Sequence, residues 1–265
     1  MTQVMGIVNV TPDSFSDGGQ YFRPEEAVRR ARNLIAEGAA IIDFGAESTR
    51  PGATPLTWEQ EWSRLEPVLS LFLTPHPSTL TPQPSTHNSQ LPTLNSFPLI
   101  SIDTYHPETA RRSIGLGATI LNCVYAETIP AMLALLREFP QTELVMPSRC
   151  WDQVADDAAL RSRIYLDPMI GFGTTREEDL ALLRAIPDLA KKGRVLVGAS
   201  RKRIVKKLTG EKVTGKNLGG NLGIAVWCAL NGAAVVRVHD VRETVQAIKV
   251  METIRGVDGV GEDLS

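Results

Sequence analysis

Short apolar runs recur along the chain, and most are separated by stretches in which apolar residues repeat at helical spacing. Short runs of this kind bounded by polar residues are typical of strands buried on both faces, so each predicts one strand. The runs lie at 4–8, 39–45, 98–103, 117–122, 143–146, 163–167, 194–200 and 233–239. Eight strands interleaved with helices predict an α/β fold: a (β/α)8 TIM barrel that forms a single domain over 1–265, with an open doubly wound sheet as the alternative.

Local signals mark the first two helices. Between 24 and 38, apolar residues recur at helical spacing, two glutamates occupy the first turn, and Gly38 stands where the helix should end. Further on, Thr57 and Gln60 have the spacing of a capping box, in which each side chain bonds to the other's backbone N–H. We therefore expect a second helix to begin just after Thr57.

Two segments interrupt the alternation. The chain has no Asp, Glu, Lys or Arg from 67 to 102, and Pro, Ser and Thr dominate a segment at about 74–97. This composition favours a tolerated surface insertion over a docking motif for a partner. The fifth crossover, 147–164, has room for at most a short helix.

Composition excludes several classes of protein. The 265 residues are 43% apolar and 22% charged with a net charge of −2, which is typical of globular proteins and lacks the basic patch of a nucleic-acid binder. No signal peptide or membrane span is indicated, so we expect a cytoplasmic protein without a membrane partner. The three cysteines are far apart and lack CxxC spacing, which predicts reduced thiols.

The first predicted strand is followed by a long loop. Residues 9–19 contain Pro12, two glycines and Phe15, and they show no periodicity. Long ordered loops at the carboxyl end of a strand are more often functional than idle. This loop therefore predicts a functional site near the end of the first strand.

Polar side chains follow almost every predicted strand. They are Asn9, Asp43, Asp103, Asn122, Ser148 near Met146, Asp167, Ser200 with Lys202, and Arg237 with His239. In an α/β barrel the carboxyl ends of the strands converge on one face, where active sites are built. Any one of these residues could be a structural cap, but the whole set predicts an active site.

The residue types indicate the chemistry of this site. Buried carboxylates and amides suit a ligand rich in N–H donors and carbonyls, whereas Lys202, Arg237 and His239 form a cationic wall suited to phosphate. The segment GASRKR predicts a turn that leads into a helix, whose first amides could hold an anion. The chain has no GxxxxGK[ST], no GxGxxG after the first strand and no HExxH.

Six segments resemble the dihydropteroate synthase family: MGIVNVTPDSFSDGG, DFGAESTRPGA, ISIDTY, DPMIGFG, GASRKR and RVHD. They occur in the family's order and span nearly the whole chain apart from the insertion. The resemblance implies a (β/α)8 barrel that joins 4-aminobenzoate to 6-hydroxymethyl-7,8-dihydropterin diphosphate and releases pyrophosphate with Mg²⁺. It also implies a homodimer, for which the face with Ile248 and Met251 is a candidate, although apolar residues there are more often core.

The resemblance also implies roles for individual residues. Those expected around the pterin are Asp43, Asp103, Asn122, Met146, Asp167, Phe172 and Lys202. Those expected at the diphosphate are Asn9, Thr49, Arg237 and His239, with Asn9 also at the metal. Those expected at the aminobenzoate are Phe15, Thr49, Arg50, Pro51, Ser200 and Lys202. The residues expected to carry out catalysis are Asp103, Asp167, Lys202 and Arg237.

The chain departs from the family pattern in several places. The family usually has Asp at Cys123, Gly at Met169, Lys at Thr174 and a Met-His-Met run where this chain has MPS. These changes and the short fifth crossover keep open an alternative, a catalytically weak pterin-binding paralogue that acts as a sensor or partner protein. A pterin-dependent methyltransferase on the same barrel is a third hypothesis, but the SRK and RVHD segments favour the synthase.

Overall fold

The computed structural model describes residues 1–11, 23–47, 54–73, 98–213 and 215–256. Eight parallel strands form a closed barrel in sequence order, and β1 pairs with β8 in the register Met5 to Arg237. The strands are β1 (Gln3–Asn9), β2 (Ile41–Gly45), β3 (Leu99–Asp103), β4 (Ile120–Asn122), β5 (Glu143–Pro147), β6 (Ile164–Asp167), β7 (Arg194–Val197) and β8 (Val235–Val238). The predicted barrel is confirmed, and the open sheet is excluded by the β1–β8 pairing.

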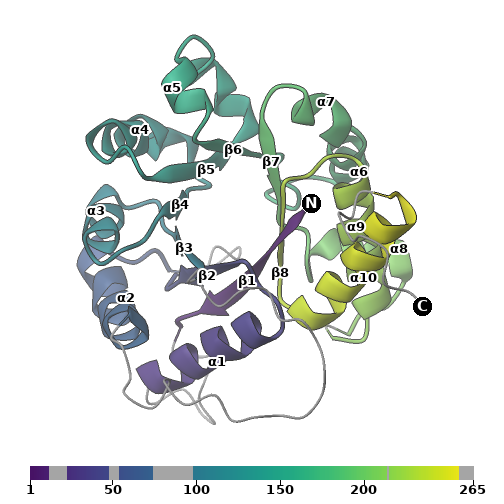
Figure 1. Ribbon diagram of the computed structural model, residues 1–265, viewed down its shortest axis with the longest axis horizontal. Helices are drawn as coiled ribbons and strands as arrows, with labels where there is room; N and C mark the ends of the chain where they lie inside the picture. The colour runs from purple at the N-terminus through teal and green to yellow at the C-terminus, as the bar shows by residue number, and fades with distance from the viewer. Residues whose placement is uncertain (12–22, 48–53, 74–97, 214, 257–265) are drawn as a thin grey trace.

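Helices surround the strands (Figure 1). They are α1 (Pro24–Ala36), α2 (Trp58–Leu73), α3 (Pro107–Gly115), α4 (Ile129–Glu138), α5 (Ala158–Arg161), α6 (Arg176–Arg184), α7 (Ile186–Ala190), α8 (Arg203–Thr209), α9 (Leu218–Leu230) and α10 (Val241–Ile254), with 3-10 turns η3 (Ala126–Thr128) and η4 (Ser148–Gln153). Within the described residues, no helix is long and apolar enough to cross a membrane.

The local signals are confirmed where the structure describes them. Helix α1 ends at Ala36, and Gly38 follows with φ +103°, a left-handed value that favours glycine. Thr57 N donates to Gln60 Oε1 at 3.0 Å, and Gln60 N donates to Thr57 Oγ1 at 3.4 Å, just before α2. The fifth crossover holds only η4 and the four-residue α5. The insertion expected at about 74–97 lies outside the described residues.

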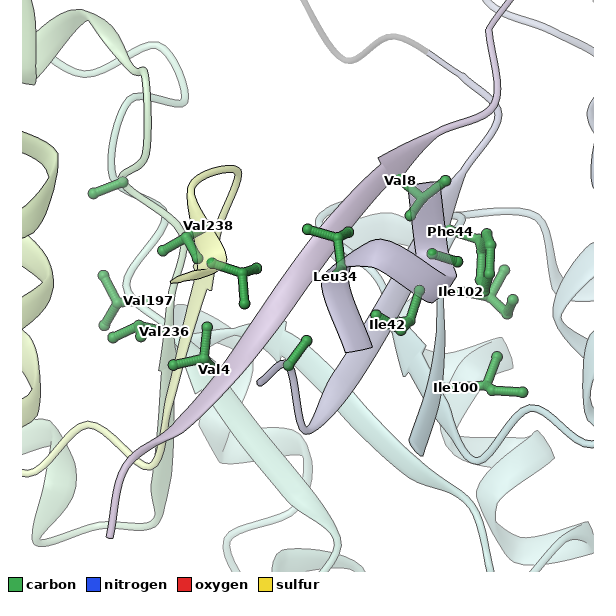
Figure 2. Close-up of a cluster of buried hydrophobic side chains, with 14 of the residues drawn as sticks. Val4, Val8, Leu34, Ile42, Phe44, Ile100, Ile102, Val197, Val236 and Val238 are labelled. Atoms are coloured by element: carbon green, nitrogen blue, oxygen red, sulfur yellow. The ribbon is translucent and has the colours of Figure 1, made fainter. Parts of the chain in front are cut away.

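Successive side chains of each strand point alternately into the barrel and toward the helices. The helix-facing side chains form the large core; Figure 2 shows part of it around Leu34 of α1, with labelled residues from β1, β2, β3, β7 and β8. A second set of side chains fills the barrel interior: Met5, Ile41, Ile120, Val145, Tyr165, Leu196 and Val235. This apolar layer closes the interior, so polar side chains farther along the strands lie at the carboxyl-end rim.

Candidate active site

Arg237 joins three strand ends into one hydrogen-bonded network. From β8, its Nε donates to Asp43 Oδ2 on β2 at 2.6 Å, and its Nη2 donates to Asp103 Oδ2 on β3 at 2.7 Å. Asn122 at the end of β4 donates to the same Oδ2 of Asp43 at 3.2 Å. Asp43 is fully buried and Asn122 is 3% exposed, whereas the side chains of Arg237 and Asp103 are 19% and 20% exposed, so the network is buried on one side and open to a ligand on the other.

A glycine makes room for this network. Gly45 pairs with Asp103 across β2 and β3, and a Cβ placed on Gly45 would lie 3.2 Å from Asp103 Cβ. That distance is shorter than in ordinary packing, so a larger residue would press against the Asp103 side chain that Arg237 holds. The glycine in the predicted strand therefore matters for the position of Asp103.

The charges in this network depend on one another. Burial works against the charge of Arg237, but Asp43 and Asp103 outweigh it and raise the pKa of Arg237. Burial raises the pKa of Asp103 to about 7; the Arg237 guanidinium opposes this shift, and the nearby Asp43 carboxylate adds to it. Asp43 Oδ1 and Asn122 Oδ1 are buried acceptors that lack a hydrogen-bond partner among the described residues. A ligand with N–H donors would satisfy both acceptors.

Asp167 and Lys202 also lie at the rim. Asp167, at the end of β6, is 6% exposed and its Oδ1 accepts the Met169 N–H at 2.7 Å. Lys202 Nζ donates to Ile170 O at 2.6 Å and lies 4.1 Å from the centre of the Phe172 ring. Burial lowers the pKa of Lys202 to about 8, against the opposing charge of Asp167. Burial raises the pKa of Asp167, and the positive charge of Lys202 opposes this upward shift.

Ser200 and His239 lie together beyond the ends of β7 and β8. Ser200 Oγ is 3.1 Å from His239 Nδ1, and it accepts the His239 backbone N–H at 3.3 Å. Arg30 from α1 donates to His239 O at 2.8 Å. Burial, together with the positive charges of Arg201 and Arg237, lowers the pKa of His239 to about 4. His239 is therefore neutral at physiological pH.

The turn that GASRKR predicts is confirmed, and it leads into helix α8. Helix α8 begins at Arg203, and Arg201 has φ +60°, a left-handed conformation unusual for arginine. Arg201 N donates to Asn221 Oδ1 at 2.9 Å, and Arg201 Nη2 donates to Asp240 Oδ1 at 2.5 Å. Ser200 thus lies in the turn before α8, which contacts with α9 and Asp240 hold in place, and it does not begin the helix.

The structure places most of the expected site residues at one rim. Those that converge there are Asp43, Asp103, Asn122, Asp167, Phe172, Ser200, Lys202, Arg237 and His239. Asn9 is exposed at the end of β1, beside Gly45 in the sheet. Phe15, Thr49, Arg50 and Pro51 lie outside the described residues.

Met146 is not brought to the rim. It is fully buried in the cluster that β4, β5 and β6 form with α3 and α4. The alternation of side chains explains this, since Val145 belongs to the barrel interior and its neighbour must face the helices. Cys123, 1% exposed, lies in the same cluster, with Sγ 3.2 Å from Thr128 Oγ1. The change from the family's Asp at Cys123 therefore falls behind the rim.

Three buried carboxylates on helices escaped the sequence reasoning: Glu252 on α10, which accepts the Thr2 N–H, and two that act near the rim. Glu61 on α2 is fully buried, and its Oε2 accepts the Thr104 hydroxyl at 2.6 Å next to Asp103. Asp179 on α6 is 1% exposed and holds the segment after β6. Each of these two acids occupies the apolar face of its helix, since Leu65 and Leu183 follow four residues later and are buried. A carboxylate at a position that the helical period assigns to the buried, apolar face was the sequence signal that could have identified both residues.

This arrangement can bind one ligand with several N–H donors beside an anionic group. The carboxylates and Asn122 provide acceptors, whereas Arg237, Lys202 and the neutral imidazole of His239 provide donors for negative charge. Among the described residues, no group of three or more His, Cys, Asp or Glu side chains could hold a metal ion.

Three comparisons match this chain to known proteins. A family model described as "Pterin binding enzyme" matches residues 5–75 and 151–239. The chain is 34% identical to a dihydropteroate synthase from Streptococcus pyogenes, over 95% of each sequence. It is similar to a Xanthomonas albilineans dihydropteroate synthase structure with 4-aminobenzoic acid, with a TM-score of 0.81, 33% identity and coverage of 97% of this chain and 94% of that one. A structure of the Xanthomonas enzyme with 7,8-dihydropteroate gives a TM-score of 0.76, 30% identity and coverage of 97% and 95%.

Proposed function

The chain belongs to the family of pterin-binding enzymes, among the dihydropteroate synthases, and from this premise we propose the reaction for which its rim is built. It is a transferase of folate biosynthesis that condenses 6-hydroxymethyl-7,8-dihydropterin diphosphate with 4-aminobenzoate. The products are 7,8-dihydropteroate and pyrophosphate. The observation that carries the proposal is the network in which Arg237 joins Asp43 and Asp103, with Asn122 beside them.

The pterin is recognised by the buried acceptors of the rim. Its ring N–H and amino groups donate to Asp103, Asn122 and Asp167, while Lys202 donates to a ring acceptor. This assignment is supported by the unpartnered acceptor of Asn122 and by the burial of Asp167. A site built from such groups rejects ligands that lack the matching donors, because its own polar atoms would then stay unpaired.

The diphosphate is placed against Arg237, His239 and Asn9. His239 binds it as a neutral donor, which its lowered pKa supports. Asn9 offers a hard amide oxygen, which fits Mg²⁺ as one protein ligand; Mg²⁺ commonly takes its other ligands from phosphate and water. When bound, Mg²⁺ supplies neutralisation of the charge that grows on the leaving diphosphate.

Catalysis follows from stabilising the two charges that separate. As the bond between the pterin methylene and the diphosphate breaks, the methylene becomes positive and the leaving oxygen becomes negative. Arg237 and His239 stabilise the leaving group, and the carboxylates of Asp103 and Asp167 lie on the pterin side. The aminobenzoate nitrogen then attacks the methylene, forms the new C–N bond and loses a proton.

The second substrate is placed beside Ser200 and Lys202. The Ser200 hydroxyl and the Lys202 ammonium bind the aminobenzoate carboxylate, which their position at the rim supports. Phe15, Thr49, Arg50 and Pro51 complete this site and exclude water that would otherwise capture the cation, as the resemblance implies.

One experiment tests the whole proposal. Pyrophosphate release is measured with both substrates and Mg²⁺, and we expect release only when all three are present. A catalytically weak paralogue would bind the pterin without turnover. The enzyme is favoured because relatives that match this chain over 95% of their length are dihydropteroate synthases.

Calorimetry tests the order of binding. Because the second site needs the diphosphate, calorimetry should detect aminobenzoate binding only with pyrophosphate or the pterin diphosphate. Equal affinity without them would contradict this order.

A homodimer is part of the proposal. Ile248, at 3% exposed, is buried in the core, and Met251 packs against the same core, so this face offers little surface to a partner. The exposed Val250 and Ile254 of α10, which line a shallow groove, are better candidates. Sedimentation of the protein and of Ile254→Asp tests this, and an unchanged dimer would exclude this face.

The cytoplasmic location stays a prediction, for cell fractionation to test.

A further inference from the structure

The segment after β6 has an unusual backbone. Between 168 and 174, Met169, Gly171 and Gly173 have φ values of +66°, +77° and +74°. The left-handed region is free of steric cost for glycine but not for methionine. Three such residues within five positions do not hold themselves in place, so other contacts must fix this segment.

A buried carboxylate on the next helix supplies those contacts. Asp179 Oδ1 accepts the Gly171 N–H at 2.7 Å and the Thr174 hydroxyl at 2.5 Å. The Gly171 N–H also reaches Thr174 Oγ1 at 3.1 Å. At the other end of the segment, Asp167 Oδ1 accepts the Met169 N–H. The segment is therefore held from both ends by carboxylates.

The held segment in turn positions Lys202. Its Ile170 carbonyl accepts the Lys202 Nζ at 2.6 Å, and its Phe172 ring lies 4.1 Å from that nitrogen. The fit at Gly171 is close, because an added Cβ would lie 2.9 Å from Lys202 Cδ. A shift of the 168–174 backbone would thus move the ammonium group.

We propose that Asp179 is a positioning residue for the condensation: it fixes Gly171 and Thr174 and so sets the place of Lys202 and Phe172. This inference rests on the proposed function, because Lys202 and Phe172 matter through the pterin they face. It also gives Thr174 a role, since its hydroxyl is one of the two donors to Asp179. The change from the family's lysine at this position is therefore compatible with an ordered site.

Two substitutions of Asp179 test whether its role depends on its accepting hydrogen bonds. Asp179→Ala removes the acceptor, whereas Asp179→Asn keeps an oxygen for both donors. We expect Asp179→Ala to raise the KM for the pterin diphosphate by about 10- to 100-fold, and to raise the KM for aminobenzoate as well, because Lys202 is placed at both substrates. Asp179→Asn should restore the pterin KM to within about threefold. Thr174→Val, which removes one donor, should have an intermediate effect if Asp179→Ala fails to fold.

Asp157→Ala is the matched control. Asp157 Oδ1 also accepts a backbone N–H, that of Leu160 at 3.0 Å, but it caps α5, in the crossover before β6. We expect this control to lower the melting temperature and leave both KM values unchanged. Two results would overturn the positioning role. In the first, Asp179→Ala lowers only the melting temperature, as the control does. In the second, Asp179→Asn raises the pterin KM as much as Asp179→Ala does.

Hydrogen exchange separates this inference from the proposed function. Without substrates, the Gly171 amide should exchange faster in Asp179→Ala than in wild type, and Asp179→Asn should restore its protection. Unchanged exchange in Asp179→Ala overturns the inference even if wild type is active. Wild type that releases no pyrophosphate refutes the proposed function, and the exchange result then still decides whether Asp179 holds the segment.

Discussion

The hydroxyl oxygen of Ser200 lies 3.1 Å from Nδ1 of His239 and joins two sides of the rim. Ser200 Oγ accepts the His239 backbone N–H, so its single proton is available to Nδ1 as long as aminobenzoate is absent, and a bound carboxylate would compete for that proton. When Ser200 donates to Nδ1, the neutral imidazole carries its proton on Nε2, where it can meet a phosphate oxygen. The proposed aminobenzoate and diphosphate sites are thus linked through one hydrogen bond.

Ser200→Ala tests this link. We expect the KM for aminobenzoate to rise about tenfold, because one hydrogen bond to a charged group is lost. The affinity for inorganic pyrophosphate should also fall, since the proton on Nε2 is no longer fixed. Calorimetry with pyrophosphate alone measures the second effect. Unchanged pyrophosphate affinity would mean that the bond does not couple the two sites.

Asp167→Asn tests pterin recognition. In the proposed pterin site the Asp167 carboxylate accepts two hydrogen bonds from N–H groups of the pterin. The amide of the asparagine variant has one acceptor oxygen, and its NH2 group would face a pterin N–H that it cannot accept. We expect pterin affinity to fall by about 30- to 1,000-fold, which corresponds to about 2–4 kcal/mol.

The stability of the same variant provides its control. The amide oxygen of Asn can still accept the Met169 N–H, so the melting temperature should change little. A lowered melting temperature with normal pterin binding would assign Asp167 to the turn alone.

Arg237→Met tests the shared guanidinium. Asp43 and Asp103 would be left without their cation, and we expect the free energy of unfolding to fall by about 3–5 kcal/mol. Activity should be lost as well. The double variant Asp43→Asn with Arg237→Met should recover part of the stability but none of the activity, because one buried charge is removed while the diphosphate contact stays absent. Denaturant unfolding measures both variants, and no recovery in the double variant would argue against the charge explanation.

Glu61→Gln tests the buried acid beside Thr104. Burial raises the pKa of Glu61 from 4.5 to about 7, so the folded state binds a proton that the unfolded state has released between these values. The contribution of Glu61 to wild-type stability therefore falls as pH rises from 4.5 to 7. The glutamine variant has no such loss and should become more stable than wild type by at most about 3 kcal/mol above pH 7, with little difference near pH 4.5. Thermal melts across this range measure the difference, and parallel curves would refute it.

The elements of this fold were accessible from sequence because their signals are local. Each apolar run is long enough to form one strand, and the Thr57–Gln60 pair marks the start of α2 within four residues of chain. Strand ends also identified Asp103, Asn122 and Asp167, since parallel strands must present their carboxyl ends on one face. The order of these elements and the rim chemistry were thus determined by the sequence alone.

Only the tertiary structure decided which polar groups meet. Arg237 bonds to Asp43 and Asp103 from 194 and 134 residues away, contacts that exist because closure brings β8 beside β1. Strand alternation turned Met146 into the helix-facing core, and burial brought Asp179 from α6 onto the segment that holds Lys202. Local periodicity says which residues prefer to be buried, but only closure of the barrel determines the partner that each buried group finds.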